Sequence, residues 1–258
     1  MKHIEKRFLL ELDGDKFDLN NETFEVVHFD KNFDHKTLNA KKNSVVFIIT
    51  DKKKAYGGFV HKVEGKNYLL PVPDPTLIYF HNAQINIARI KASKADLLKK
   101  LDFTQELSET AIKEIYQFYG ETTGFVIFLF TSMESFINQI IPEDYIYKKE
   151  LPKRTEVYNK KQIQESIDFK TKITDIISAV KGKSFFANQT PTNQLIWNLK
   201  EFRDDIIHTK PDGNLLKYDK LIKTSLNFKY EDTLHAVAKF MNFYKTDYII
   251  ECDCGADF

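Results

Sequence analysis

Three residues near the C-terminal third of the chain, an arginine, an aspartate and a histidine, have types and spacing that suit phosphodiester chemistry. Arg203 carries a planar, permanently charged guanidinium that can donate two parallel hydrogen bonds to a phosphate. His208 follows five residues later, and histidine is the side chain best suited to exchange protons near neutral pH. Asp204 lies one helical turn before His208, where its carboxylate could bond one imidazole nitrogen and fix the tautomer of the other.

The segment that carries these residues is predicted to be a helix over residues 191–209. Thr190 is a preferred N-cap residue, and Pro191 suits the first helical position. Pro211 disfavours helical geometry at Lys210, so the end of the helix is marked as well. Apolar residues at spacings of four, three and four predict one stripe that faces a helical core: Leu195, Leu199, Phe202 and Ile206.

One straight helix does not bring Arg203 and His208 together. At about 100° per residue, Asp204 and His208 project on the same side, near Trp197, whereas Arg203 is roughly 140° from His208. A shared site therefore requires a distorted helix end, a second element, or the same helix from a second subunit. The last arrangement predicts a two-fold dimer with this helix at its interface.

The segment Arg203-Asp-Asp-Ile-Ile-His208 resembles the Arg-x4–6-His motif of the HEPN superfamily, in which a polar residue commonly follows the arginine. The long helix predicted upstream, which includes residues 132–141, also looks like the opening helix of that family. HEPN domains are helical bundles that usually dimerise, and many are metal-independent endoribonucleases of toxin–antitoxin, CRISPR-associated and anti-phage systems. The resemblance covers about residues 105–250 and leaves the first hundred residues without an assignment.

This resemblance implies a metal-independent endoribonuclease of a defence or toxin-type system that needs no cofactor. The RNA 2′-hydroxyl would attack its own adjacent phosphate and leave a 2′,3′-cyclic phosphate, so DNA would be spared. His208 would act as general acid or base, and Arg203 would stabilise the charge on the phosphate. Asp204 would orient the histidine, while Glu134, which we expect to reach Arg203, and Lys210 are auxiliary candidates.

Two readings from other classes stay open beside the nuclease. The domain could be a non-catalytic HEPN-like dimerisation or ligand-binding module that recruits partner proteins. It could also be an unrelated helical scaffold, in which Asp204 and His208 form an ordinary surface pair and Arg203 closes a salt bridge with Glu201 or a neighbour. An open basic cleft that joins Arg203 and His208 across a subunit boundary would favour the nuclease.

The pattern of the whole chain predicts an α+β protein. A β-rich domain over residues 1–104 is expected to contain strands at 7–12, 23–29, 44–50 and 58–63, with further strands at 77–80 and 85–90, a tight turn at Gly57–Gly58 and a short helix opened by Ser93. A HEPN-like helical domain follows over residues 105–250, with helices predicted at 108–141, 161–180, 218–225 and 230–244. The first of these is either one long helix or two helices joined at Gly120–Gly124. A tail spans residues 251–258.

Composition limits the protein class. Apolar residues make up 42% and charged residues 29% of the 258 residues, with a net charge of +1, which excludes a disordered chain. The longest apolar run, residues 125–130, is far shorter than the roughly 20 residues of a membrane-spanning helix. The N-terminus lacks a secretory apolar segment, so we expect a soluble, cytoplasmic protein whose partners are RNA, a second copy and a regulatory protein bound by the front domain.

Three other groups of residues are weaker candidates. Cys252 and Cys254 supply only half of a tetrahedral zinc site, and an incidental tail is the simpler interpretation. His28 and Asp30 share a strand face near His35, for which a solvated face is the default. Lysine clusters at 52–54, 99–100 and 148–154, interleaved with tyrosines, could follow a phosphate backbone but are more often solvated surface.

Overall fold

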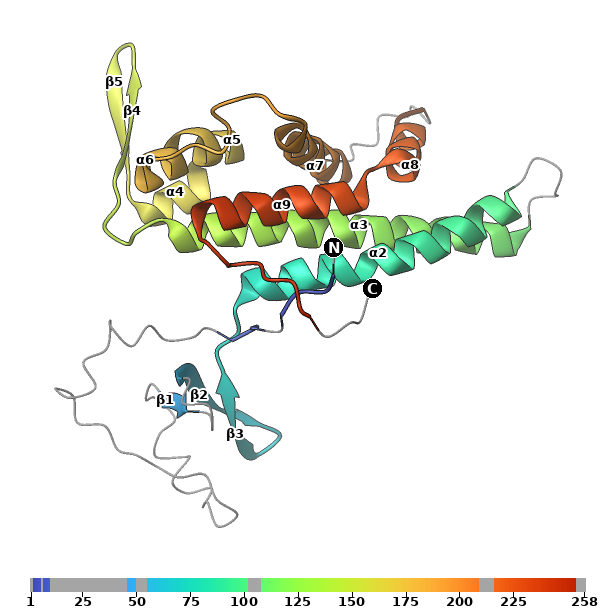
Figure 1. Cartoon of the computed structure of the whole chain (residues 1–258), viewed down its shortest axis with the longest axis horizontal. Helices are drawn as coiled ribbons and strands as arrows, with labels where there is room; N and C mark the ends of the chain where they lie inside the picture. The colour runs from blue at the N-terminus through green and yellow to red at the C-terminus, as the bar shows by residue number, and fades with distance from the viewer. Residues whose placement is uncertain are drawn as a thin grey trace. The chain divides into compact units, whose positions relative to one another are not determined.

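The computed structural model describes residues 2–5, 7–9, 46–49, 55–101, 108–208 and 216–253. Within these residues the fold is mixed α+β, as the sequence predicts, with two small antiparallel sheets and a larger set of helices (Figure 1). The chain divides into two compact units. We call Lys6–Pro75 the sheet unit, and Met1–Glu5 with Thr76–Phe258 the helical unit.

The sheet unit contains an antiparallel sheet in the order β1–β2–β3. Its strands are β1 (Val46–Ile49), β2 (Ala55–Val63) and β3 (Lys66–Pro71), which confirms the predicted strands at 44–50 and 58–63.

The hairpin turns at Glu64 and Gly65, where both φ angles are positive, and not at Gly57–Gly58. Gly58 instead allows β1 to approach, because a Cβ there would lie 2.9 Å from Cδ1 of Ile48. Residues 23–29, with His28 and Asp30, His35 and lysines 52–54 lie outside the described residues.

The strands predicted at 77–80 and 85–90 are wrong, because this region is a single helix, α2 (Pro75–Lys100). Its buried apolar residues recur every three to seven positions along one face: Leu77, Phe80, Ala83, Ile87, Ile90 and Leu97. Ser93 lies inside the helix, where its hydroxyl donates to the carbonyl of Arg89 at 2.9 Å, and does not open a new one. The two compact units consequently divide at Pro75 and Thr76 instead of near residue 104.

The long helix α3 (Glu109–Ile140) passes through the core of the helical unit as one uninterrupted element. Ser108 caps its N-terminus by accepting a hydrogen bond from the amide of Ala111 at 3.2 Å. The apolar segment of residues 125–130 lies in the core, as its composition predicts. Four of its side chains are at most 3% exposed: Phe125, Val126, Leu129 and Phe130.

The two glycines of α3 have opposite surroundings, which predicts opposite effects of alanine. At Gly120 a Cβ meets nothing within 4 Å, so Gly120→Ala should raise the free energy of unfolding by about 0.5–1 kcal/mol through helix propensity. At Gly124 the same Cβ would lie 2.8 Å from Nδ2 of Asn86, a buried side chain of α2. Gly124→Ala should therefore lower the free energy of unfolding measured in urea below that of the wild type. An equal increase in this free energy for both variants would contradict the packing of Gly124 against Asn86.

A hairpin and a set of short helices follow α3. The lysine-rich segment forms β4 (Tyr147–Leu151) and β5 (Arg154–Tyr158), a two-stranded ribbon that sequence analysis did not predict. The helix predicted at 161–180 is divided into α4 (Lys160–Ser166), α5 (Phe169–Thr171), the π-helical turn η2 (Lys172–Ile176) and α6 (Ile177–Lys181). The division occurs at Ile167 and Asp168, whose backbones are extended, and the Asp168 carboxylate caps α5 through the amide of Thr171.

Three further helices complete the helical unit and confirm the predicted ones: α7 (Pro191–Ile207), α8 (Leu216–Asn227) and α9 (Tyr230–Tyr244). α7 packs against both α3 and α9, and α9 also contacts α3 (Figure 1). Aromatic rings join these helices: Phe125 lies edge-on to Tyr230 at 5.1 Å, and Phe136 lies edge-on to Phe240 at 6.1 Å. This packing fixes the position of α7 within the bundle.

The two ends of the chain meet against α2. Ile4 forms an antiparallel bridge with Glu251, and the side-chain amide of Gln84 accepts from the Ile4 amide and donates to the Lys2 carbonyl. Gln84 is completely buried, so this contact satisfies both of its polar ends. In the part of the chain that the structure describes, no helix is long and apolar enough to cross a bilayer.

Candidate functional site

The candidate site lies on the second half of α7, and the helix signals predicted at its N-terminus are confirmed, whereas Lys210 and Pro211 lie outside the described residues. The Thr190 hydroxyl accepts from the amide of Asn193 at 3.1 Å, and Pro191 is the first helical residue. The helix ends at Ile207, and the backbone amide of its C-cap residue His208 still donates to the carbonyl of Asp204 at 2.9 Å. The buried stripe is shifted from the predicted one: Leu199 and Phe202 are in the core together with Asn193 and Ile196, whereas Leu195 and Ile206 are only half-buried.

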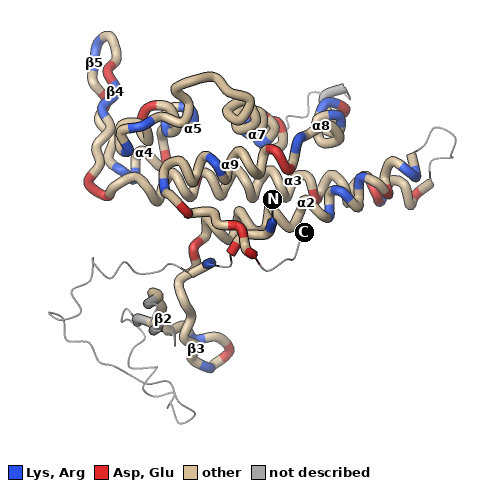
Figure 2. Tube along the Cα trace, in the orientation of Figure 1, with Lys and Arg blue, Asp and Glu red and all other residues tan. Residues whose placement is uncertain are grey.

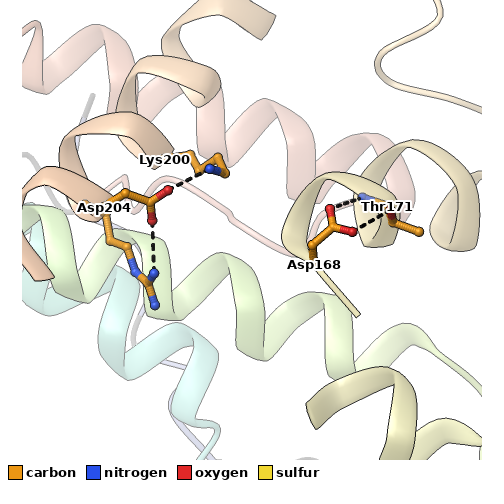
Figure 3. A network of polar contacts seen from close by, with 5 residues as sticks. Asp168, Thr171, Lys200 and Asp204 are labelled. Carbon is orange, nitrogen blue, oxygen red and sulfur yellow. Dashed lines mark hydrogen bonds and ion pairs between the residues drawn. The ribbon is translucent and has the colours of Figure 1, made fainter. Parts of the chain in front are cut away.

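Asp204 is the centre of a charged triad on α7 (Figure 3). Its carboxylate accepts from Nζ of Lys200 at 2.6 Å and from Nη1 of Arg203 at 3.0 Å. Burial alone would raise the pKa of Asp204, but the hydrogen bonds from the two cations outweigh it, so the pKa is lowered from its ordinary value. Lys200 was missed by sequence reasoning, although its spacing of four residues before Asp204 is a visible signal.

Arg203 is held from two directions. Its carboxylate partner is Asp204, and its guanidinium carbon lies 4.9 Å from the centre of the Phe130 ring on α3. The Phe130 ring in turn contacts Phe169 on α5, with ring centres 4.7 Å apart. The Arg203 side chain remains 26% exposed, so the guanidinium is fixed in direction and still reaches solvent with donors that Asp204 does not use.

His208 does not receive the side-chain bond that the sequence suggested. Asp204 directs both carboxylate oxygens to the cations on α7, and its connection to His208 is through the backbone alone. Within the described residues, the His208 imidazole has neither a hydrogen-bond partner nor an ion-pair partner, and the residue is exposed. The predicted orienting role of Asp204 toward His208 is therefore not seen in the single chain, and Asp204 orients Arg203 instead.

The auxiliary candidates are not assembled with Arg203. Glu134 is half-buried on α3, and among the described residues the ion-pair partner of Arg203 is Asp204 and not Glu134. The charge of Glu134 acts on Lys172, a buried lysine of η2 that donates to the carbonyl of Gln164 at 2.8 Å. Burial lowers the pKa of Lys172, and Glu134 opposes that change. Lys210 lies outside the described residues.

The lowered pKa of Asp204 predicts acid-dependent stability. A carboxylate with a depressed folded-state pKa stabilises the protein above the ordinary value of 3.8, and this contribution is lost as the pH falls through the lower pKa. Asp204→Asn should cost about 1 kcal/mol of unfolding free energy at neutral pH, with the difference closing in acid. Asp219→Asn is a matched control, because Asp219 forms an i,i+4 pair with Lys223 at 2.8 Å and should cost only about 0.3–0.5 kcal/mol. A constant difference between Asp204→Asn and wild type across the pH range would contradict the network.

The remaining candidates from the sequence are the lysine-rich segment and the two cysteines. The hairpin β4–β5 carries lysines 148, 149 and 153 with Arg154, but Arg154 is paired with Glu156 at 2.5 Å. Basic and acidic positions are both distributed over the helical unit (Figure 2). Cys252 is half-buried, with its backbone amide bonded to the carbonyl of His3, and Cys254 lies outside the described residues. The described residues contain no cluster of three or more side chains able to hold a metal ion.

Comparison of the chain with models of protein families, with curated proteins and with solved structures finds no match to any of them. The site itself offers a fixed guanidinium at Arg203, a nearby lysine at Lys200 and, five residues after Arg203, an exposed imidazole. The two cations can bind a phosphate, and the imidazole can exchange a proton. Both functions act on one ligand if that ligand, or a second subunit, bridges Arg203 and His208.

Proposed function

We propose that the helical unit is a HEPN-type, metal-independent endoribonuclease in which Arg203 and His208 carry out the reaction. The observation that carries the proposal is the combination on one helix end of a guanidinium oriented by Asp204 and Phe130 with an exposed imidazole free of side-chain partners in the described chain. An oriented cation costs little reorganisation when a phosphate binds. An exposed imidazole can reach a substrate proton.

In the proposed reaction, the 2′-oxygen of a ribose attacks the adjacent phosphorus, and the bond from phosphorus to the 5′-oxygen of the next nucleotide breaks. The products are a 2′,3′-cyclic phosphate and a 5′-hydroxyl. The His208 imidazole of one subunit takes the proton from the 2′-hydroxyl, and the leaving 5′-oxygen receives a proton from water. Arg203 stabilises the charge that accumulates on the non-bridging phosphate oxygens.

This scheme needs two copies of α7. Arg203 and His208 are about 140° apart around an ideal helix, and in the described residues Arg203 bonds Asp204 on its own helix. A two-fold axis beside the exposed end of α7 would bring the imidazole of one subunit to the guanidinium of the other and so form two equivalent sites. The proposed assembly is accordingly a homodimer through the helical unit, with RNA as substrate and a defence or toxin-type role.

One experiment separates this proposal from its alternatives. The full chain is incubated with total RNA and tRNA in EDTA, alongside an RNA oligonucleotide whose sugars are all 2′-deoxy. We expect the RNA to be cut with cyclic-phosphate ends and the deoxy strand to remain intact. Cleavage of both strands, or cleavage abolished by EDTA, would refute the proposed chemistry.

A second candidate function is favoured by a specific contact. The ion pair with Asp204 and the contact with the Phe130 ring both stabilise the fold around Arg203. Such contacts are expected of a structural arginine in a non-catalytic dimerisation or ligand-binding module. In that case the purified dimer should leave RNA intact under all of these conditions, while changes at Arg203 should alter stability alone.

A further inference from the structure

The β4–β5 ribbon is a sheet of two strands, to which the described part of the chain adds no third. It projects away from the helices of the helical unit (Figure 1). α4 follows β5 directly and packs against it, so β4 is the edge that a further strand would meet. Beyond the ribbon, no described residue bonds the backbone of β4. An edge of this kind is a template for strand pairing, and a two-stranded ribbon alone is only marginally stable in water.

One face of the ribbon is ordered by contacts within it. The register places Tyr147 opposite Tyr158 and Lys149 opposite Glu156 on this face. Glu156 accepts hydrogen bonds from the Tyr158 hydroxyl at 2.7 Å and from Nε of Arg154 at 2.9 Å. These two bonds lower the pKa of Glu156, and the charges of Arg154 and Lys149 add to them. A carboxylate therefore lies across from Lys149 at neutral pH.

The opposite face of the ribbon is open. It carries Lys148 and Glu150 on β4, which lie across from Val157 and Thr155 on β5. All four residues are exposed, Val157 to 54%. Within the described residues, neither Lys148 nor Glu150 has an ion-pair partner. The open edge strand thus presents one unpaired cation and one unpaired anion, two residues apart.

β4 is complementary to itself in one antiparallel register. When two copies of the strand pair about a two-fold axis at Lys149, Lys148 of each copy lies opposite the partner's Glu150. The same register places Tyr147 opposite the partner's Leu151, so an apolar pair lies outside each charged pair. Opposite charges and apolar side chains that face each other directly across two strands stabilise the pairing.

The charges on this edge favour a second copy over an unrelated strand. Lysine on an edge strand normally opposes pairing, and Lys148 is compensated only where the added strand supplies an acid in register. Lys149 meets its own copy at the axis, and the Glu156 carboxylate across from it reduces that repulsion. β5 has no comparable register, because pairing about Glu156 would place two carboxylates together and Arg154 opposite the partner's Tyr158.

We propose that β4 pairs with β4 of a second copy of this chain, which gives a four-stranded antiparallel sheet in the order β5–β4–β4–β5. This interface is separate from the one proposed at the end of α7, since the ribbon lies at one end of the helical unit and α8, which follows α7, lies toward the other (Figure 1). Contacts at both places would join α7 dimers into larger assemblies. The ribbon interface does not depend on the α7 dimer or on cleavage of RNA.

The test is sedimentation equilibrium of the full chain over a range of concentrations, with three charge variants. Lys148→Glu and Glu150→Lys each place like charges across both pairs, so each should move the midpoint of self-association to at least about tenfold higher concentration. The double variant, Lys148→Glu with Glu150→Lys, reverses both partners and should restore the wild-type midpoint. Lys113→Glu is the matched control, because it makes the same change at an exposed position of α3 and should associate like wild type.

A disulfide measures the register directly. With the native thiols removed by Cys252→Ser and Cys254→Ser, Lys149→Cys should form a cross-linked dimer under mild oxidation, since the two thiols meet at the axis. Val157→Cys, an exposed position on β5, should stay monomeric on a denaturing gel. The proposal is overturned if Lys148→Glu associates like wild type, if the double variant does not recover, or if both cysteine variants cross-link equally. None of these readouts uses RNA, so a failed nuclease assay leaves them unaffected.

Discussion

His208→Ala is expected to reduce RNA cleavage by at least about 100-fold, the lower end of what a positioned general acid or base contributes. The loss should be in the rate at saturating RNA, with RNA binding nearly unchanged, because the imidazole acts on a proton and not on substrate affinity. His208 is exposed and follows the last residue of α7, so its removal leaves the helical packing intact and the variant should unfold like wild type. Single-turnover cleavage in EDTA measures the effect.

His61→Ala is the matched control, since His61 is an exposed histidine in β2 of the sheet unit. It should cleave RNA at the wild-type rate. Equal cleavage by wild type, His61→Ala and His208→Ala would mean that the activity comes from another site or from a contaminating nuclease. In that case the assignment of His208 would be wrong.

Arg203→Lys is expected to lower cleavage by about 100- to 1,000-fold, as for the loss of one oriented donor to a transition-state charge. Lysine keeps the positive charge but cannot provide the planar fork, so a charge requirement alone would leave activity largely intact. The substitution also weakens the contact with the Phe130 ring, which should cost about 0.5–1 kcal/mol of stability. Thermal unfolding beside cleavage kinetics separates the two effects.

Arg89→Lys is the control for arginine replacement, because Arg89 is an exposed residue of α2 whose contact with Glu121 is long, at 3.9 Å. It should change neither cleavage nor stability measurably. If Arg203→Lys loses stability without losing activity, Arg203 is structural, and the dimerisation or ligand-binding module becomes the better description.

Mixing the two inactive variants tests the shared site. If Arg203 of one subunit works with His208 of the other, a mixed dimer of Arg203→Lys and His208→Ala contains one complete pair of wild-type residues. An equimolar mixture refolded together should then regain about a quarter of the wild-type rate, since half of the dimers are mixed and each has one complete site of two. No recovery in dimers shown to be mixed would exclude a site built across the two-fold axis.

Helix ends and continuous apolar segments could be predicted from the sequence because their causes are local. Ser108 and Thr190 cap helices through bonds to amides only three residues away, so residue type and position suffice. The apolar run of residues 125–130 could only be accommodated in a core, and the structure has it there. By contrast, the apolar segment of residues 77–90 contains aromatic and β-branched residues that fit a buried strand equally well. In the structure the segment is part of α2, with its buried residues on one helical face and Asn86 beside Gly124 of α3.

Residue types and local spacing are enough to predict which residues of α7 could carry out phosphate chemistry and where that helix begins. How those residues are used depends on the packing of α7 against the other helices. The Asp204 carboxylate could bond either the His208 imidazole or the cations of α7. It bonds Arg203 and Lys200, and Phe130 of α3 holds the guanidinium beside it. A groove between α7 and α9, lined by Gln194 and His235 among others, likewise depends on residues about forty positions apart, which no local pattern connects. Side chains from distant segments become neighbours only when the core has packed, since burial of apolar surface, and not local preference, sets how helices meet.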